Sequence, residues 1–152
     1  MQKLNIGDVE LGNLARLLRR VDFFAPLTVA QLEKILPYIL LYSFEAGETV
    51  FRQGGPGDSF YIIHQGRVSI RIKPGFFRRE KEIKTIGSGD FFGEMALLSD
   101  KPRTATVVCV EPSQVYILTA VDFRYIVKEN PSFAAEVDKI AQRRKFEDNL
   151  GR

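Results

Sequence analysis

Glycine is concentrated in the middle of this chain, and its spacing limits the possible folds more than any other feature. Nine of the twelve glycines lie between Gly47 and Gly93. They separate short segments rich in isoleucine, valine, phenylalanine and tyrosine, such as ETVFRQ, SFYIIHQ and RVSIRIK, and a similar segment, QVYILT, follows further on. Short β-type segments divided by turn signals roughly every eight to twelve residues are typical of a β-sandwich, jelly roll or barrel. We therefore predict about eight short strands in residues 38–119.

The residues on both sides of this strand region have the period of amphipathic helices. The apolar residues that recur at the spacing of one helix face are Leu14, Leu17, Leu18 and Val21. A second short helix is predicted after Thr28, a good N-cap residue, and is expected to end at Pro37. Two more helices are predicted after the strands, the second starting near Pro131. The fold class is therefore mainly β, with N-terminal helices in residues 1–37 and C-terminal helices in residues 120–152.

Composition excludes several classes of protein. A chain of 152 residues that is 45% hydrophobic and 27% charged fits one globular domain. Its net charge of +3 is too small for a nucleic-acid-binding stripe, so we expect no direct contact with nucleic acid. The single cysteine, Cys109, excludes an internal disulfide framework, and its apolar surroundings VVCV predict a buried, inert thiol. We find no apolar stretch long enough to span a membrane and no signal peptide, so we expect a cytoplasmic location.

The most informative motif is FFGEMALLSDKPRTATV, at residues 91–107. Gly93 lets the backbone approach a ligand closely, because glycine has no Cβ. The residues from Glu94 to Leu98 all favour helix, so a short helix should begin beside Gly93. The first amides of a helix have no partner within it and favour anions. This half of the motif therefore predicts a site for a phosphate or a similar anion.

The second half of the motif adds a permanent cation. Arg103 follows Pro102, and a guanidinium can bind two phosphate oxygens at once. Thr104 adds a hydroxyl group beside it. Glu94 would repel a phosphate, so it makes sense only if it faces another part of the ligand, such as a sugar hydroxyl. Alternatively, Glu94 and Arg103 could pair with each other in the empty site.

The run FGEMALL followed by PRTATV resembles the phosphate-binding cassette of cyclic nucleotide-binding domains. The upstream run GGPGDSFYIIHQGRVSI resembles a strand pair of the same family, and the similarity covers roughly residues 21–141. The resemblance implies an eight-stranded, jelly-roll-like β-roll with flanking helices, forming a single domain over residues 1–152. It also implies a non-enzymatic regulatory domain in which ligand capture rearranges the C-terminal helices.

The resemblance assigns roles to individual residues. Glu94 would bind the ribose 2′-hydroxyl, and Arg103 would bind the cyclic phosphate with help from Thr104 and nearby backbone amides. The implied ligand-binding residues are Phe92, Gly93, Glu94, Met95, Ala96, Arg103, Thr104 and Ala105. Candidates for the base pocket are Ile83, Val107, Ile140 and Arg144, although ordinary core packing explains the apolar ones equally well.

The expected ligand is cAMP, with cGMP as the second choice, and no further cofactor is predicted. His64 is the only histidine, so a metal site or a metal-dependent enzyme on a similar scaffold is not expected. The alternative function is a protein-interaction module on the same fold that binds no nucleotide. The signal would be passed to an effector domain in the same chain or to a partner protein in trans. The sequence is also compatible with a homodimer.

Overall fold

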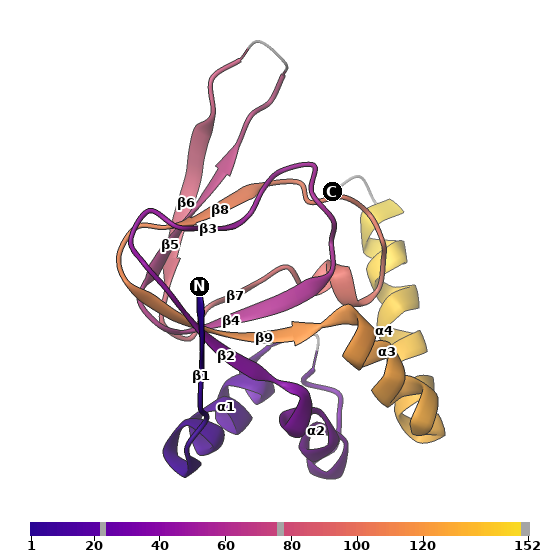
Figure 1. The fold of residues 1–152 in the computed structure, drawn as a ribbon. Helices are drawn as coiled ribbons and strands as arrows, with labels where there is room; N and C mark the ends of the chain where they lie inside the picture. Colours follow the sequence, from indigo (N-terminus) through magenta and orange to yellow (C-terminus); the bar gives the residue numbers. More distant parts are fainter. Residues whose placement is uncertain (22–23, 76–77, 150–152) are drawn as a thin grey trace.

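The structure is a computed structural model that describes residues 1–21, 24–75 and 78–149, with the side chains of residues 144–149 left aside. Figure 1 shows strands curling into a roll, with the two N-terminal helices below it and the two C-terminal helices at its right. The strands are Gln2–Leu4 (β1), Leu40–Phe44 (β2), Thr49–Phe51 (β3), Ser59–Gln65 (β4), Arg67–Ile72 (β5), Lys81–Gly87 (β6), Phe91–Phe92 (β7), Thr106–Cys109 (β8) and Ser113–Thr119 (β9). The α-helices are Asp8–Arg20 (α1), Val29–Ile35 (α2), Ala120–Glu129 (α3) and Pro131–Asn149 (α4). Two 3₁₀ turns, Leu36–Tyr38 (η1) and Glu94–Leu97 (η2), complete the order.

The strands form two antiparallel sheets. One has five strands in the order β1-β2-β9-β4-β7, and the other has four in the order β3-β8-β5-β6. The predicted β-roll with flanking helices is confirmed, and in the described chain its eight strands β2 to β9 all lie within residues 38–119. The structure adds strand β1, where the sequence indicated only helix. Three residues are too few for a periodic signal, and β1 forms because it pairs with β2, with Leu4 opposite Leu41.

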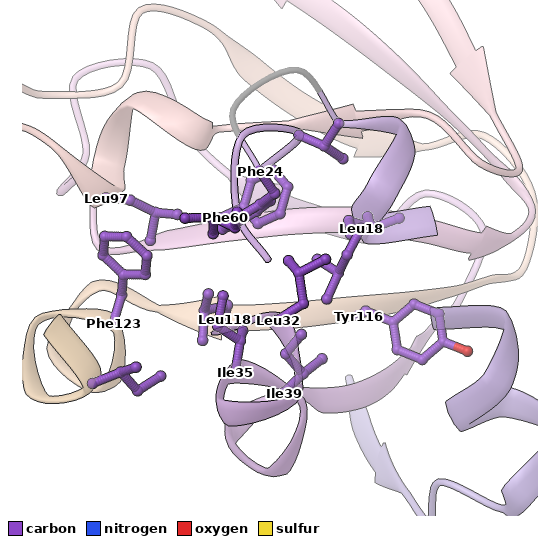
Figure 2. Packing of buried hydrophobic residues seen from close by; sticks show 14 of the residues in the cluster. Leu18, Phe24, Leu32, Ile35, Ile39, Phe60, Leu97, Tyr116, Leu118 and Phe123 are labelled. Atoms are coloured by element: carbon purple, nitrogen blue, oxygen red, sulfur yellow. The ribbon is translucent and has the colours of Figure 1, made fainter. Parts of the chain in front are cut away.

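The helices cover the outer face of the five-stranded sheet. Leu14 and Leu18 of α1 are fully buried there, as the helical period predicted. Helix α2 begins with a capping box, in which the Thr28 side chain accepts from the Gln31 amide and the Gln31 side chain accepts from the Thr28 amide. It ends at Ile35, and η1 continues the chain for one more turn. We call the apolar core on this face the helix-side core; Figure 2 shows Phe24, Phe60, Leu97, Leu118 and Phe123 within it.

A second apolar core lies between the two sheets, and we call it the intersheet core. It is formed by Phe44, Tyr61, Ile63, Val68, Phe92, Val107, Cys109, Val115 and Ile117. Successive side chains of a strand point to opposite faces, so Phe60 and Ile62 of β4 join the helix-side core while Tyr61 and Ile63 join the intersheet core. Cys109 is fully buried, as predicted, and burial raises the pKa of its thiol.

The two C-terminal helices follow directly from β9. The Thr119 side chain caps α3 by accepting a hydrogen bond from the Asp122 amide at 3.1 Å. Phe133 and Ile140 of α4 are buried in the helix-side core. Among the described residues, none of the helices has the length and apolar character that crossing a membrane requires.

Candidate functional site

A cavity of about 550 Å³ adjoins the intersheet core, because Phe92 and Val107 belong to that core and also line the cavity. Small-molecule sites usually measure roughly 300–1,000 Å³, so this volume suits a nucleotide-sized ligand. Phe51 of β3 and Ile70 of β5 form part of its wall, and most of the remainder comes from residues 92–107. The structure places on this wall all eight residues of the predicted ligand set, namely Phe92, Gly93, Glu94, Met95, Ala96, Arg103, Thr104 and Ala105.

Gly93 lines the cavity, and both its backbone conformation and its close neighbours favour glycine there. Its φ angle of +81° lies in the left-handed region that favours glycine. A Cβ atom at this position would lie 2.9 Å from Nη1 of Arg103 and 3.1 Å from the Ser59 carbonyl oxygen. A side chain at residue 93 would therefore push Arg103 out of its present position.

The short helix predicted after Gly93 is the 3₁₀ turn η2. The Ala96 amide donates to the Gly93 carbonyl oxygen at 3.2 Å, so this amide already has a partner. A turn of four residues carries little of the macrodipole of a full helix, so individual amides and side chains must provide any affinity for an anion. Glu94 is half-buried on the cavity wall, and Leu97 points the other way into the helix-side core.

Arg103 is the principal cation of the cavity and is only 7% exposed. Its Nη2 donates to the Ser59 carbonyl oxygen at 2.6 Å and lies 3.8 Å from a carboxylate oxygen of Asp58. Within the described structure, its buried Nε has no hydrogen-bond partner. Buried donors are nearly always paired in folded proteins, so this nitrogen marks a position where an acceptor is missing.

The turn GGPGD fixes the loop that carries Arg103. The Arg103 amide donates to the Gly55 carbonyl oxygen, and the Gly54 amide donates to the Arg103 carbonyl oxygen, both at 2.8 Å. A Cβ on Gly57 would lie 2.6 Å from the Lys101 carbonyl oxygen. The sequence marked this turn only as a break between strands, and the structure shows that it also braces the site.

Three aromatic side chains cluster beside Arg103, and two of them, Phe51 and Phe92, line the cavity. The rings of Tyr61 and Phe92 stack with centroids 4.9 Å apart and planes 9° apart. The Phe51 ring lies against both, and the Arg103 guanidinium carbon lies 4.0 Å from the Phe51 ring centroid. Burial is the largest influence on the Tyr61 phenol and raises its pKa.

A family model for the cyclic nucleotide-binding domain matches residues 41–130, which include the cavity-lining residues. The chain belongs to the cyclic nucleotide-binding domain family. The resemblance of the cassette to this family is thereby confirmed.

Relatives of this cyclic nucleotide-binding domain occur inside larger proteins. Isozyme 2 of the cGMP-dependent protein kinase of Drosophila melanogaster is 36% identical over 106 residues, which is 70% of this chain and 11% of the kinase. The regulatory subunit of the cAMP-dependent protein kinase of Colletotrichum orbiculare is 30% identical over 131 residues, which is 86% of this chain and 31% of the subunit. This chain therefore spans less than a third of either relative.

A solved structure gives the same picture of the fold. The N-terminal domain of a transcriptional regulator from Streptomyces coelicolor superposes with a TM-score of 0.77 at 26% identity. The match covers 89% of this chain and 96% of that one.

The predicted base-pocket residues of this cyclic nucleotide-binding domain are scattered. Val107 lines the cavity, whereas Ile83 lies on β6, is 56% exposed and is absent from the described lining. The isoleucine on the wall is Ile70 of β5, which the sequence did not single out. Ile140 is buried in the helix-side core, away from the cavity lining, and the side chain of Arg144 lies outside the described residues.

Metal ligands do not gather in the part of this domain that the structure describes. No group of three or more histidine, cysteine, aspartate or glutamate side chains is arranged there to hold a metal ion.

Proposed function

We propose that this domain is a sensor that binds cAMP or cGMP in the cavity between η2 and β8. The observation that carries the proposal is the arrangement of Arg103 and Glu94 on one cavity wall. Arg103 is buried, with its Nε unpartnered in the described structure, and Glu94 is half-buried at the start of η2. A ligand with both a phosphate and a ribose hydroxyl matches a cation and a carboxylate in one site.

The two charges would bind different parts of the ligand. A phosphate oxygen would accept from Nε of Arg103, which would give this buried donor its missing partner. The Glu94 carboxylate would accept from the ribose 2′-hydroxyl. The apolar part of the wall, including Ile70, Ala105 and Val107, would contact the base.

Between the two nucleotides we favour cAMP, with cGMP as the second candidate. The names of the relatives support the ligand class, because one is a cGMP-dependent kinase and the other a regulatory subunit of a cAMP-dependent kinase. Thr104 is an exposed hydroxyl on the cavity wall and could serve either base.

The signal would leave the site through η2. Its residue Leu97 is 4% exposed and belongs to the helix-side core together with Phe123 of α3 and Phe133 of α4. Figure 2 shows Leu97 between Phe60 and Phe123. A shift of η2 on ligand capture would have to repack these contacts, because close-packed cores do not deform continuously. We propose that α3 and α4 rearrange in response.

The role we propose is regulatory and not catalytic. The effector would be another domain of a longer chain or a separate protein, in line with relatives of which this chain covers less than a third. A cytoplasmic location and formation of a homodimer are further parts of this proposal.

Titration calorimetry with cAMP, cGMP and their 2′-deoxy forms tests the proposal. We expect at least one ribonucleotide to bind with micromolar or tighter affinity. Its 2′-deoxy form should bind roughly 10- to 150-fold more weakly, the value of one hydrogen bond to a charged group. Glu94→Gln should reduce this discrimination, whereas Glu111→Gln, which changes an exposed carboxylate outside the cavity lining, should preserve it. Failure of both nucleotides to bind at millimolar concentration would overturn the proposal and favour the interaction module.

A further inference from the structure

The phenyl ring of Phe51 lies where it can control the orientation of Arg103. The guanidinium carbon is 4.0 Å from the ring centroid, within the range of a cation–π interaction. Phe51 belongs to strand β3, 40 residues before the cassette (residues 91–107) that supplies Arg103. Resting on the proposed function, we propose that Phe51 is a positioning residue that orients Arg103 for the phosphate and thereby sets nucleotide affinity.

The Phe51 ring is one of three neighbours that surround the Arg103 guanidinium group. The Ser59 carbonyl oxygen accepts from Nη2 at 2.6 Å on another side. Gly93 closes a third side, because an added Cβ would lie only 2.9 Å from Nη1. A long, rotamer-rich side chain held on three sides loses little further freedom when it binds an anion, and such preorganisation raises affinity.

Phe51 is itself held in place. Its ring centroid lies 5.5 Å from that of Tyr61 and 5.8 Å from that of Phe92, and the latter two rings stack on each other. Offset aromatic contacts of this kind restrict ring motion in a packed core. The ring therefore gives Arg103 a fixed surface to lie on.

The aromatic ring of Phe51 can partly compensate the buried charge of Arg103, which an aliphatic side chain cannot do. Arg103 is 7% exposed and its Nε has no partner in the described structure, so its charge needs compensation when no anion is bound. The negative face of the ring supplies part of it. The competing partner is Asp58, whose carboxylate is 3.8 Å from Nη2 and whose side chain is 68% exposed. Without the ring, we expect Arg103 to turn toward Asp58 and away from the cavity.

The first test uses the nucleotide-free protein, so it does not depend on binding. In a spectrum of ¹⁵N-labelled arginine side chains, the Arg103 Nε–H signal, identified by its loss in Arg103→Lys, should be shifted by the ring current of Phe51. The Tyr61 ring centroid also lies 5.6 Å from the guanidinium carbon, so Phe51→Leu should remove most of this shift and leave the smaller part that Tyr61 causes. Phe51→Tyr should keep the shift. Phe44→Leu is the matched control, because Phe44 lies in the same intersheet core but outside the cavity lining. An Arg103 signal unmoved by Phe51→Leu would overturn the proposal.

The second test asks whether the ring acts through Arg103. Phe51→Leu should weaken binding of the better cyclic nucleotide by between about 2-fold and 30-fold, the range of cation–π energies. In an Arg103→Ala background, Phe51→Leu should weaken binding less than about 2-fold. With Arg103 present, Phe51→Tyr should keep most of the affinity that Phe51→Leu loses. An equal loss in both backgrounds would overturn the proposal, because the ring would then act on the ligand directly. Absence of nucleotide binding in the unmodified protein would overturn the proposed function instead, and the arginine spectrum would still decide the role of Phe51.

Discussion

The two faces of the five-stranded sheet are both buried, but they are filled in different ways. On the outer face, Phe60 and Leu118 pack with helix residues in the helix-side core. On the inner face, Tyr61 and Ile117 pack in the intersheet core, and next to them lie a cavity of about 550 Å³ and the buried charge of Arg103. Neighbouring residues of one strand thus serve different purposes. One face should carry mostly stability, and the other should carry binding.

The largest effect should come from emptying the helix-side core. Phe60 is 1% exposed, and its ring lies 5.5 Å from that of Phe24 and 6.0 Å from that of Phe91. We expect Phe60→Ala to lower the free energy of unfolding by about 3–5 kcal/mol, because it leaves a cavity in a packed core. Urea unfolding measures this loss. Ile83→Ala is the control, since Ile83 is 56% exposed and should change stability by no more than about 0.5 kcal/mol. A loss below about 1 kcal/mol for Phe60→Ala would contradict the division between the faces.

Substitutions on the cavity side of the sheet should change the affinity for cyclic nucleotide. Arg103→Ala removes the buried cation whose Nε lacks a partner, and we expect cyclic nucleotide affinity to fall roughly 10- to 150-fold. Calorimetry of the variant and of Arg67→Ala gives the comparison, because Arg67 is exposed and absent from the cavity lining. If Arg103→Ala binds as well as the unmodified domain, the assignment of the phosphate site is wrong.

The sequence predicted the parts of the molecule that depend on local pattern. The helical period predicted the burial of Leu14 and Leu18, and the glycine-divided strands predicted a sandwich, jelly roll or barrel, which the family resemblance narrowed to a β-roll. The cassette residues are close in sequence, so Gly93, Glu94 and Arg103 could be identified together, and the structure gathers them on one wall. Features that depend on residues close together in the sequence could therefore be predicted from the sequence.

Contacts between distant segments were not visible. Nothing near Phe51 in the sequence shows that it lines a pocket and is not an ordinary core residue. Its partner, Arg103, lies far along the chain, in the loop between η2 and β8. The choice between Ile70 and Ile83 depends on how β5 and β6 are paired. The register shifts between Ile70 and Arg71, so Ile70 lies opposite Lys84 while Arg71 lies opposite Glu82, and the intervening Ile83 has no partner in this pairing. Such a bulge is set by the fold and not by a local pattern.

A pH titration distinguishes the faces by another route. Desolvation, with a smaller contribution from Glu10, raises the pKa of Tyr116 in the helix-side core to about 12, from an ordinary value near 10. Between pH 10 and 12 the unfolded chain loses this proton and the folded chain keeps it. Stability should therefore be intact below pH 10 and fall by about 2 kcal/mol as pH rises toward 12.

Tyr116→Phe isolates this contribution from that of other groups. The variant loses the hydrogen bond from the Tyr116 hydroxyl to the Glu10 carbonyl oxygen at every pH, which shifts the whole curve. Its decline between pH 10 and 12 should nevertheless be shallower than that of the unmodified domain in urea unfolding. Parallel curves for the two proteins would show that Tyr116 does not titrate with a raised pKa.

The smallest effect should come from the start of α2, which presents Leu32 and Ile35 to the helix-side core. Thr28→Ala removes the side chain that accepts from the Gln31 amide at 3.1 Å, and we expect a loss of about 1 kcal/mol in the free energy of unfolding. Thr28→Ser keeps the acceptor oxygen and should recover most of this loss. Because Thr28 acts on the helix-side core and not on the cavity wall, cyclic nucleotide affinity should stay within about 2-fold. A clear loss of affinity with folding intact would mean that the helix-side core sets the geometry of the cavity, and the two faces would then have to be treated as one coupled unit.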